Sequence, residues 1–152
     1  GLPVVLGGPV LDQPELADLL AGYRRAFRPH GDSRPHVTVS LDVLVADTDA
    51  EARELALPEV WAMAESRRTG VFEALQPVPV LRDRMREDRL ATRVERALDT
   101  VSAGTRETVR RRLEQLAERT GADELLASGS TYDREALAAS DRALAGLLAP
   151  AV

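Results

Sequence analysis

Three short runs of apolar and β-branched residues are each followed by a segment with the spacing of an amphipathic helix. The runs are Leu2–Leu6, Val37–Ala46 and Leu125–Ala127. A strand followed by a helix, repeated along a chain, is typical of βα units that build a parallel sheet. Because a parallel sheet is covered on both faces and three strands make a small one, we expect these units to be part of a larger α/β structure.

Helix start and stop signals give the boundaries of these units. We expect Asp12 to cap the first helix and Thr48 to cap the second, each with a glutamate three residues later. Pro58 should kink or break the second helix, which ends at Gly70. Residues 103–105 form a break, and Thr105 should cap the helix that follows. We interpret residues 1–152 as a single partial domain with a first βα unit (1–31), a second βα unit (36–70), a helical excursion (71–103) and a final helix, strand and helix (104–150).

Composition excludes several kinds of site. The sequence has no cysteine, so disulfides, thiolate metal ligands and thiol nucleophiles are ruled out. All 20 basic residues are arginine, which excludes a Schiff-base lysine. With only two histidines, His30 and His36, we expect no metal site. Because lysine, asparagine and isoleucine, whose codons are AT-rich, are missing, we infer a bacterial source with a GC-rich genome.

Charge and hydropathy also limit the partners. The net charge of −5 gives no reason to expect a nucleic-acid partner. No run approaches the roughly 20 apolar residues that a helix needs to span a bilayer, so we expect no membrane contact. We therefore predict a cytoplasmic location.

Two longer segments resemble a known family. They are LDVLVADTDAEARELA (residues 41–56) and GTRETVRRRLEQLAERTGADELLASGSTYD (residues 104–133), and the opening GLP and the later YRRAFRP add to the likeness. Their order and spacing resemble the C-terminal half of the bacterial luciferase-like, flavin-dependent monooxygenases. The resemblance implies an α/β fold that is the C-terminal part of a TIM (β/α) barrel, with about three parallel βα units plus extra helices.

The resemblance also implies a reaction. Members of this family use FMN or a related flavin, in its reduced form and with O2, to oxidise a small organic substrate. The family's catalytic residues and its flavin-phosphate loop lie mainly before the part that this chain resembles. The catalytic residues are therefore unknown here, no cofactor is assigned to this chain alone, and we expect it to be inactive by itself.

Candidate binding residues lie in the loops after the three expected strands, because active sites of barrels form at the carboxyl ends of the strands. Small residues there can offer backbone N–H groups to an anion. The expected flavin contacts are Gly7, Gly8, Ser128, Gly129 and Ser130, although family members often carry an aromatic residue or histidine where Gly7 and Gly8 stand. The expected substrate pocket consists of Val10, Asp47, Thr48 and Thr131. An alternative reading of the last loop is an ordinary turn before a helix capped by Asp133 or Thr131.

A second function from another class stays open. A partial barrel leaves open sheet edges, which expose main-chain donors and apolar surface. Such a chain would act as a non-catalytic half-barrel association module, either as a homo-oligomer or by completing the N-terminal half of the same barrel. If the chain is instead part of a monooxygenase, its expected partner is a small-molecule substrate.

Overall fold

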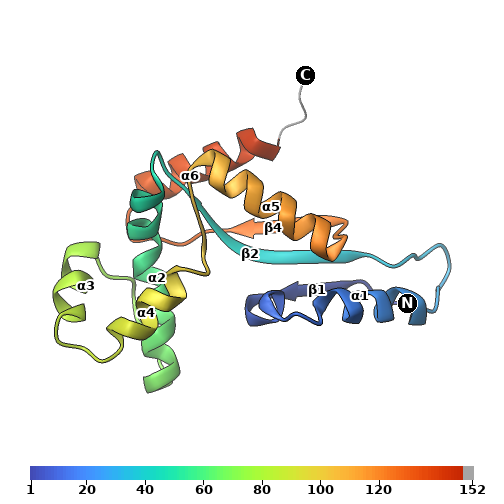
Figure 1. The fold of residues 1–152 in the computed structure, drawn as a ribbon, viewed down its shortest axis with the longest axis horizontal. Coiled ribbons are helices and arrows are strands. Elements are labelled where there is room, and N and C mark those ends of the chain that lie inside the picture. The colour runs from blue at the N-terminus through green and yellow to red at the C-terminus, as the bar shows by residue number, and fades with distance from the viewer. Residues whose placement is uncertain (149–152) are drawn as a thin grey trace. The chain divides into compact units, whose positions relative to one another are not determined.

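The computed structural model describes residues 1–148, which form two compact units. Unit 1 consists of Gly1–Leu41 and Arg111–Ser128; unit 2 consists of Asp42–Arg110 and Gly129–Val152, of which residues 129–148 are described. The elements, labelled in Figure 1, are β1 (Val4–Gly7), the short 3-10 helix η1 (Gly8–Asp12), α1 (Leu16–Ala26), β2 (Val37–Val45), α2 (Asp49–Thr69), α3 (Val78–Met85), α4 (Ala91–Leu98), β3 (Ser102–Gly104), α5 (Arg106–Thr120), β4 (Glu124–Ser128) and α6 (Arg134–Leu148).

The strands form a parallel α/β sheet that is not closed, which is the partial-barrel architecture expected from the sequence. β2 is its central strand. It pairs in parallel with β1, with Val4 opposite Val37, and in parallel with β3, with Val45 opposite Gly104; β4 also pairs with β2. The three expected strands are thus present, and β3 is an addition.

Unit 1 is built around an apolar layer between α1 and the strands. Leu16 and Leu20, one helical turn apart, are buried against Val37 and Val39 of β2. Helical spacing predicts a buried stripe of Leu16, Leu19, Leu20, Tyr23 and Phe27. Leu16 and Leu20 confirm it, but Leu19 is 56% exposed, so the prediction is wrong for that residue. Arg24 on the same helix donates to the carbonyls of Thr120 and Gly121 at 2.9 and 2.6 Å, which ties α1 to the end of α5.

Asp123 and Glu124 hold the start of β2. The Asp123 carboxylate accepts a hydrogen bond from the Val37 backbone N–H at 2.8 Å, and this bond lowers the pKa of Asp123. The Glu124 carboxylate accepts from the Thr38 hydroxyl at 3.1 Å and lies 3.5 Å from the imidazole of His36. Both acidic side chains therefore have a structural role in unit 1.

Unit 2 packs α2, α3 and α4 around a second apolar core, and Figure 1 shows α3 and α4 beside α2. As expected, the Thr48 hydroxyl caps α2 by accepting from the Glu51 N–H, and Gly70 ends α2 in the left-handed conformation with φ 79°. Of the two outcomes predicted at Pro58, a kink or a break, the break is wrong, because α2 continues through Pro58 to Thr69. The missing Pro58 N–H costs one helical bond, while its neighbours Leu57 and Trp61 are buried in the core and keep the helix in place.

Charged side chains join the same three helices. Glu95 of α4 accepts from Arg53 at 2.7 Å and from Arg82 at 2.6 Å, and Arg82 also pairs with Glu54. The hydrogen bond from Arg53 is the main reason why the pKa of Glu95 is lowered. Since these side chains are about a third or more exposed, we expect them to contribute more to orientation than to stability.

Two local expectations are corrected. Asp12 ends η1 instead of capping α1, whose preceding residue Glu15 makes no side-chain cap. Gly8, with φ 64°, turns the chain into η1, and burial of Leu11 holds that turn against the core. Residues 102–104, read as excursion and break, are strand β3; their weak β propensity is outweighed by main-chain pairing with β2.

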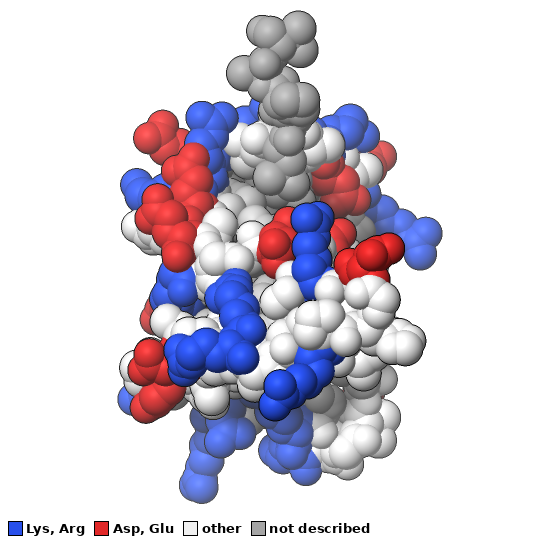
Figure 2. All heavy atoms as spheres, turned by 90° about the vertical axis from the view of Figure 1, so that its right-hand side faces the viewer, with Lys and Arg blue, Asp and Glu red and all other residues white. Residues whose placement is uncertain are grey.

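Among the described residues, no helix is long and apolar enough to cross a membrane. On the face of the molecule in Figure 2, arginine side chains are interspersed with acidic ones.

Candidate functional site

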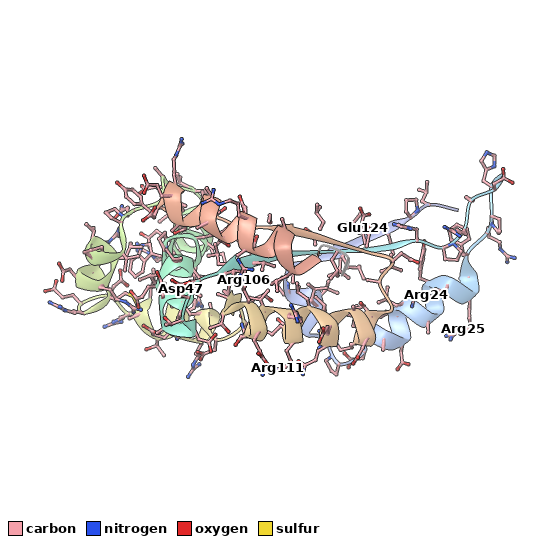
Figure 3. All side chains as sticks on the ribbon, turned by 90° about the horizontal axis from the view of Figure 1, so that it is seen from above. Arg24, Arg25, Asp47, Arg106, Arg111 and Glu124 are labelled. Carbon is pink, nitrogen blue, oxygen red and sulfur yellow. The ribbon has the colours of Figure 1, made fainter. Side chains whose placement is uncertain are left out.

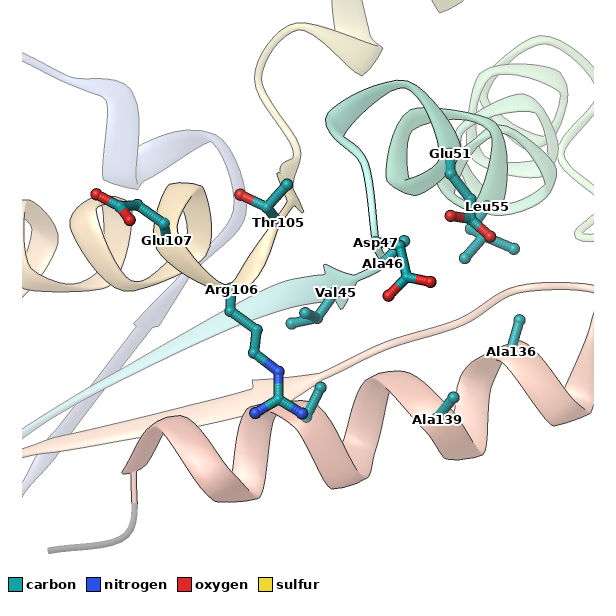
Figure 4. A pocket seen from close by; sticks show the side chains of 11 residues that line it. Val45, Ala46, Asp47, Glu51, Leu55, Thr105, Arg106, Glu107, Ala136 and Ala139 are labelled. Carbon is teal, nitrogen blue, oxygen red and sulfur yellow. The ribbon is translucent and has the colours of Figure 1, made fainter. Parts of the chain in front are cut away.

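Unit 2 contains a cavity of about 480 Å³ at the carboxyl ends of the neighbouring parallel strands β2 and β3. Figure 4 shows side chains from both strand ends and from three helices around it. Its lining residues are Val45, Ala46, Asp47, Glu51, Leu55, Thr105, Arg106, Glu107, Ala136, Ala139 and Ala143. A volume of this size is ordinary for a small-molecule site. We call this cavity the unit 2 pocket.

Main-chain contacts set the two strand ends beside each other. The Ala46 N–H donates to the Gly104 carbonyl at 3.1 Å, and the Thr105 N–H donates to the Asp49 carboxylate at 2.8 Å. A Cβ at Gly104 would lie only 2.6 Å from that carboxylate oxygen, so glycine is needed for this close approach. The Thr105 hydroxyl then accepts from the Thr108 N–H at 3.2 Å and begins α5 as predicted.

The floor of the pocket is α6. The buried hydroxyl of Ser140 accepts a hydrogen bond from the Val45 N–H at 2.9 Å, which ties α6 to the last residue of β2. Ala136, Ala139 and Ala143 follow one another at helical spacing on the side of α6 that lines the pocket. Their small side chains leave the space open (Figure 4).

Four charged side chains line the pocket. Arg106 comes from the first residue of α5, while Asp47 and Glu51 come from the end of β2 and the first turn of α2. Figures 3 and 4 show Arg106 reaching toward α6 and Asp47 pointing into the space from the opposite wall. Within residues 1–148 the side chains of Arg106, Asp47 and Glu51 form no ion pair or hydrogen bond. Glu107 also belongs to the lining, although Figure 4 shows its side chain pointing away from Arg106 and Asp47. The lining residues together carry three carboxylates and one guanidinium, a formal net charge of −2.

A second polar cluster lies in the loop after β4. The side chain of Ser130 is hydrogen-bonded to the half-buried carboxyl group of Glu59 on α2. Burial, reinforced by the nearby Asp42 carboxylate, raises the pKa of Glu59, and the bond to Ser130 opposes part of that effect. Gly129 lies so close to the Val43 carbonyl that a Cβ there would be 2.7 Å from its oxygen. The loop is thus packed tightly against β2 and α2.

The turn reading of this loop is confirmed at its end. The Asp133 carboxylate accepts from the N–H groups of Glu135 and Ala136 at 2.9 and 3.0 Å and so caps α6. Thr131 is buried, and Ser128 is exposed at the end of β4.

The remaining expected residues lie in unit 1, at the end of β1. Gly7 approaches the Ser40 carbonyl, where a Cβ would be 2.8 Å from the oxygen. Gly8 has the positive φ that turns the chain, and Val10 packs partly buried against the unit 1 core. The structure therefore explains why glycine stands at positions 7 and 8 and why an apolar residue stands at position 10.

Of the expected site residues in unit 2, the structure brings Asp47 into the pocket and uses Thr48 as the cap of α2 beside it. Sequence reasoning missed Arg106, Glu51 and Glu107. The signal for them was Gly104, directly before the predicted Thr105 cap: it ends the strand β3, whereas the sequence reasoning took it as part of a break.

The acidic residues in the unit 2 pocket and beside Ser130 affect whether a flavin phosphate could bind there. A flavin phosphate is an anion, and it would meet the net charge of −2 in the unit 2 pocket and the carboxyl groups of Glu59 and Asp42 beside Ser130. These residues do not fit the phosphate. In the described part of the chain, no three His, Cys, Asp or Glu side chains are grouped so that they could hold a metal ion.

Comparisons with known proteins show a match to one protein family and similarity to two solved structures. The model of the family described as luciferase-like monooxygenase matches residues 1–124. The structure is similar to that of apo-MsnO8, with a TM-score of 0.75 and 26% identity, over 97% of this chain and 45% of that chain. It also has the fold of the monooxygenase RslO1 from Streptomyces bottropensis, with a TM-score of 0.56 and 19% identity, over 97% of this chain and 40% of that chain. The chain therefore spans less than half the length of either. A search of curated proteins found no match.

Proposed function

The chain belongs to the luciferase-like monooxygenase family, and on this basis we propose that it forms one wall of a flavin-dependent monooxygenase that oxidises a small organic substrate with O2. The observation that carries the proposal is the unit 2 pocket, which lies at the carboxyl ends of two parallel strands in a chain of this family. Active sites of (β/α) barrels form at that end of the strands.

The reduced flavin, when bound, would supply the oxygen chemistry, and the protein would supply binding and orientation. The side chains of the unit 2 pocket would then bind the polar groups of the substrate. The flavin phosphate is held by residues outside this pocket, because the acidic lining repels it. For the same reason we propose that the chain alone does not catalyse the reaction.

Flavin titrations test the phosphate part of this proposal. The fluorescence of riboflavin and of FMN, which differ only in the phosphate, is followed as the purified chain is added. Equal or weaker affinity for FMN is expected; a clear preference for FMN would contradict the assignment. Stopped-flow oxidation of photoreduced FMN by O2 should proceed at the same rate with and without the chain.

A chimera tests the family function. In it, this chain replaces the part of MsnO8 that it matches, which is 45% of that protein. We expect the chimera to bind reduced FMN and to form an oxygenated product in any small-molecule oxidation assay in which intact MsnO8 does so, while the isolated chain does not. A folded chimera, verified by circular dichroism, that binds flavin but never yields oxygenated product would refute the monooxygenase assignment.

Association is a second candidate function, and unit 1 supplies the observation that favours it. Within the described residues, β1 pairs with β2 alone, and Leu2, Val5 and Leu19 are more than half exposed. An unpaired strand edge beside apolar side chains is a surface for adding strands. We propose that it receives further strands, from the N-terminal half of the barrel or from a second copy. A strictly monomeric chain in light scattering, unaffected by an added N-terminal half, would contradict this. The cytoplasmic location stays a prediction.

A further inference from the structure

We propose that the unit 2 pocket binds a small molecule that carries a carboxylate at one end and an ammonium group at the other. This inference names the substrate class of the pocket and rests on the proposed function in treating the pocket as a substrate site. It follows from the charges of both signs that line the cavity and from the apolar residues that line it with them.

The anionic end of the ligand is assigned to Arg106. Its guanidinium forms no ion pair or hydrogen bond to any described residue, although three carboxylates line the same cavity. One of its terminal nitrogens would lie 3.6 Å from a Cβ on Gly146, so the side chain extends from α5 to α6 across one end of the pocket (Figure 4). Arg106 is exposed to solvent, and its planar guanidinium presents two parallel N–H donors, which match the two oxygens of a carboxylate.

The cationic end is assigned to Asp47 and Glu51. Both carboxylates lie on the wall opposite Arg106 and form no ion pair with a described residue. Because neither carboxylate forms an ion pair with Arg106 in the described residues, both signs of charge remain available to a ligand. A purely anionic ligand would meet a net charge of −2, and a purely cationic one would leave Arg106 without a partner.

Apolar side chains line the same cavity. They are Val45 and Leu55 together with Ala136, Ala139 and Ala143 of α6. These side chains offer methyl and methylene surface and no hydrogen-bonding group. The middle of the ligand is therefore aliphatic, which makes an ω-amino acid the simplest compound of the class.

Binding of 6-aminohexanoate, compared with hexanoate and hexylamine, tests the inference. Chemical shifts of the ¹⁵N-labelled chain are followed by NMR without flavin, so that the result does not depend on the oxidation reaction. We expect 6-aminohexanoate to bind at millimolar concentration, with shifts at Arg106 and Asp47, and each singly charged compound to bind about tenfold more weakly, as the loss of one charge-assisted contact predicts. Equal binding of the three compounds, or no binding by 6-aminohexanoate, would overturn the inference.

Variants identify the contacts. Arg106→Gln should weaken 6-aminohexanoate about tenfold while leaving hexylamine unchanged, and Asp47→Asn should weaken hexylamine more than hexanoate. Arg110→Gln on the same helix is the matched control, because Arg110 does not line the pocket. If Arg106→Gln does not fold, Arg106→Lys keeps the charge but loses the paired donors and should still weaken binding. An equal effect of the control and Arg106→Gln would refute the assignment. If the ligand binds as stated but the chimera makes no oxygenated product, the proposed function fails and the ligand class stands.

Discussion

Replacement of Ser140 by alanine removes the hydrogen bond that connects α6 to the end of β2. Ser140 is 1% exposed, and its hydroxyl accepts from the N–H of Val45, which is 5% exposed. An unsatisfied buried donor costs about 1–3 kcal/mol, and alanine returns about 0.5 kcal/mol as the better helix former. We therefore expect the free energy of unfolding to fall by about 0.5–2.5 kcal/mol, or the melting temperature by about 1–10 °C.

The matched control is Ser66→Ala. Ser66 is also in a helix, α2, but it is only partly buried, and its hydroxyl donates a solvent-exposed hydrogen bond to the Met63 carbonyl one turn earlier. Urea unfolding followed by circular dichroism gives the difference between the two variants, and hydrogen exchange at the Val45 amide reports on the bond itself. If Ser140→Ala and Ser66→Ala have equal stability and the Val45 amide remains equally protected, the reasoning is refuted.

Three further predictions concern stability. Gly129→Ala should lower the free energy of unfolding by about 1–3 kcal/mol in urea titrations, because its Cβ would be 2.7 Å from a main-chain oxygen, whereas Gly22→Ala within α1 should raise it by up to about 1 kcal/mol. Because burial raises the pKa of Glu59, the folded chain holds that proton more tightly, and stability should fall as pH rises from the ordinary carboxyl range through the folded pKa; Glu59→Gln should abolish this dependence in melting curves. The hydrogen bond from the Val37 N–H lowers the pKa of Asp123, so the ionised side chain stabilises the folded chain above the ordinary pKa of a carboxyl group. This stabilisation should be lost as the pH falls through the lowered pKa of the folded chain. Asp123→Asn should make the melting temperature depend less on pH in this acid range.

Much of the local structure was predictable because it depends on neighbouring residues. The β-branched run of β2, the Thr48 cap and the left-handed Gly70 are each properties of a few consecutive residues. The candidate site was predictable only in part: Asp47 follows a recognisable strand, but Arg106 follows β3, whose Ser-Ala-Gly sequence has no strand signal of its own. β3 exists because β2 offers it main-chain partners, and no local pattern contains that information.

The sequence by itself determined the βα order, the family and the exclusion of cysteine and lysine chemistry, because these follow from residue identity and short-range spacing. Tertiary structure decided that α2 runs through Pro58, that β3 pairs with β2, and that Arg106 faces Asp47 across alanines of α6. The physical reason is that core burial and pairing between distant segments outweigh local preferences of a fraction of a kilocalorie to a few kilocalories per residue. Asp47 and Arg106 both line the pocket although they are about 60 residues apart in the sequence, so only folding brings them to the same site.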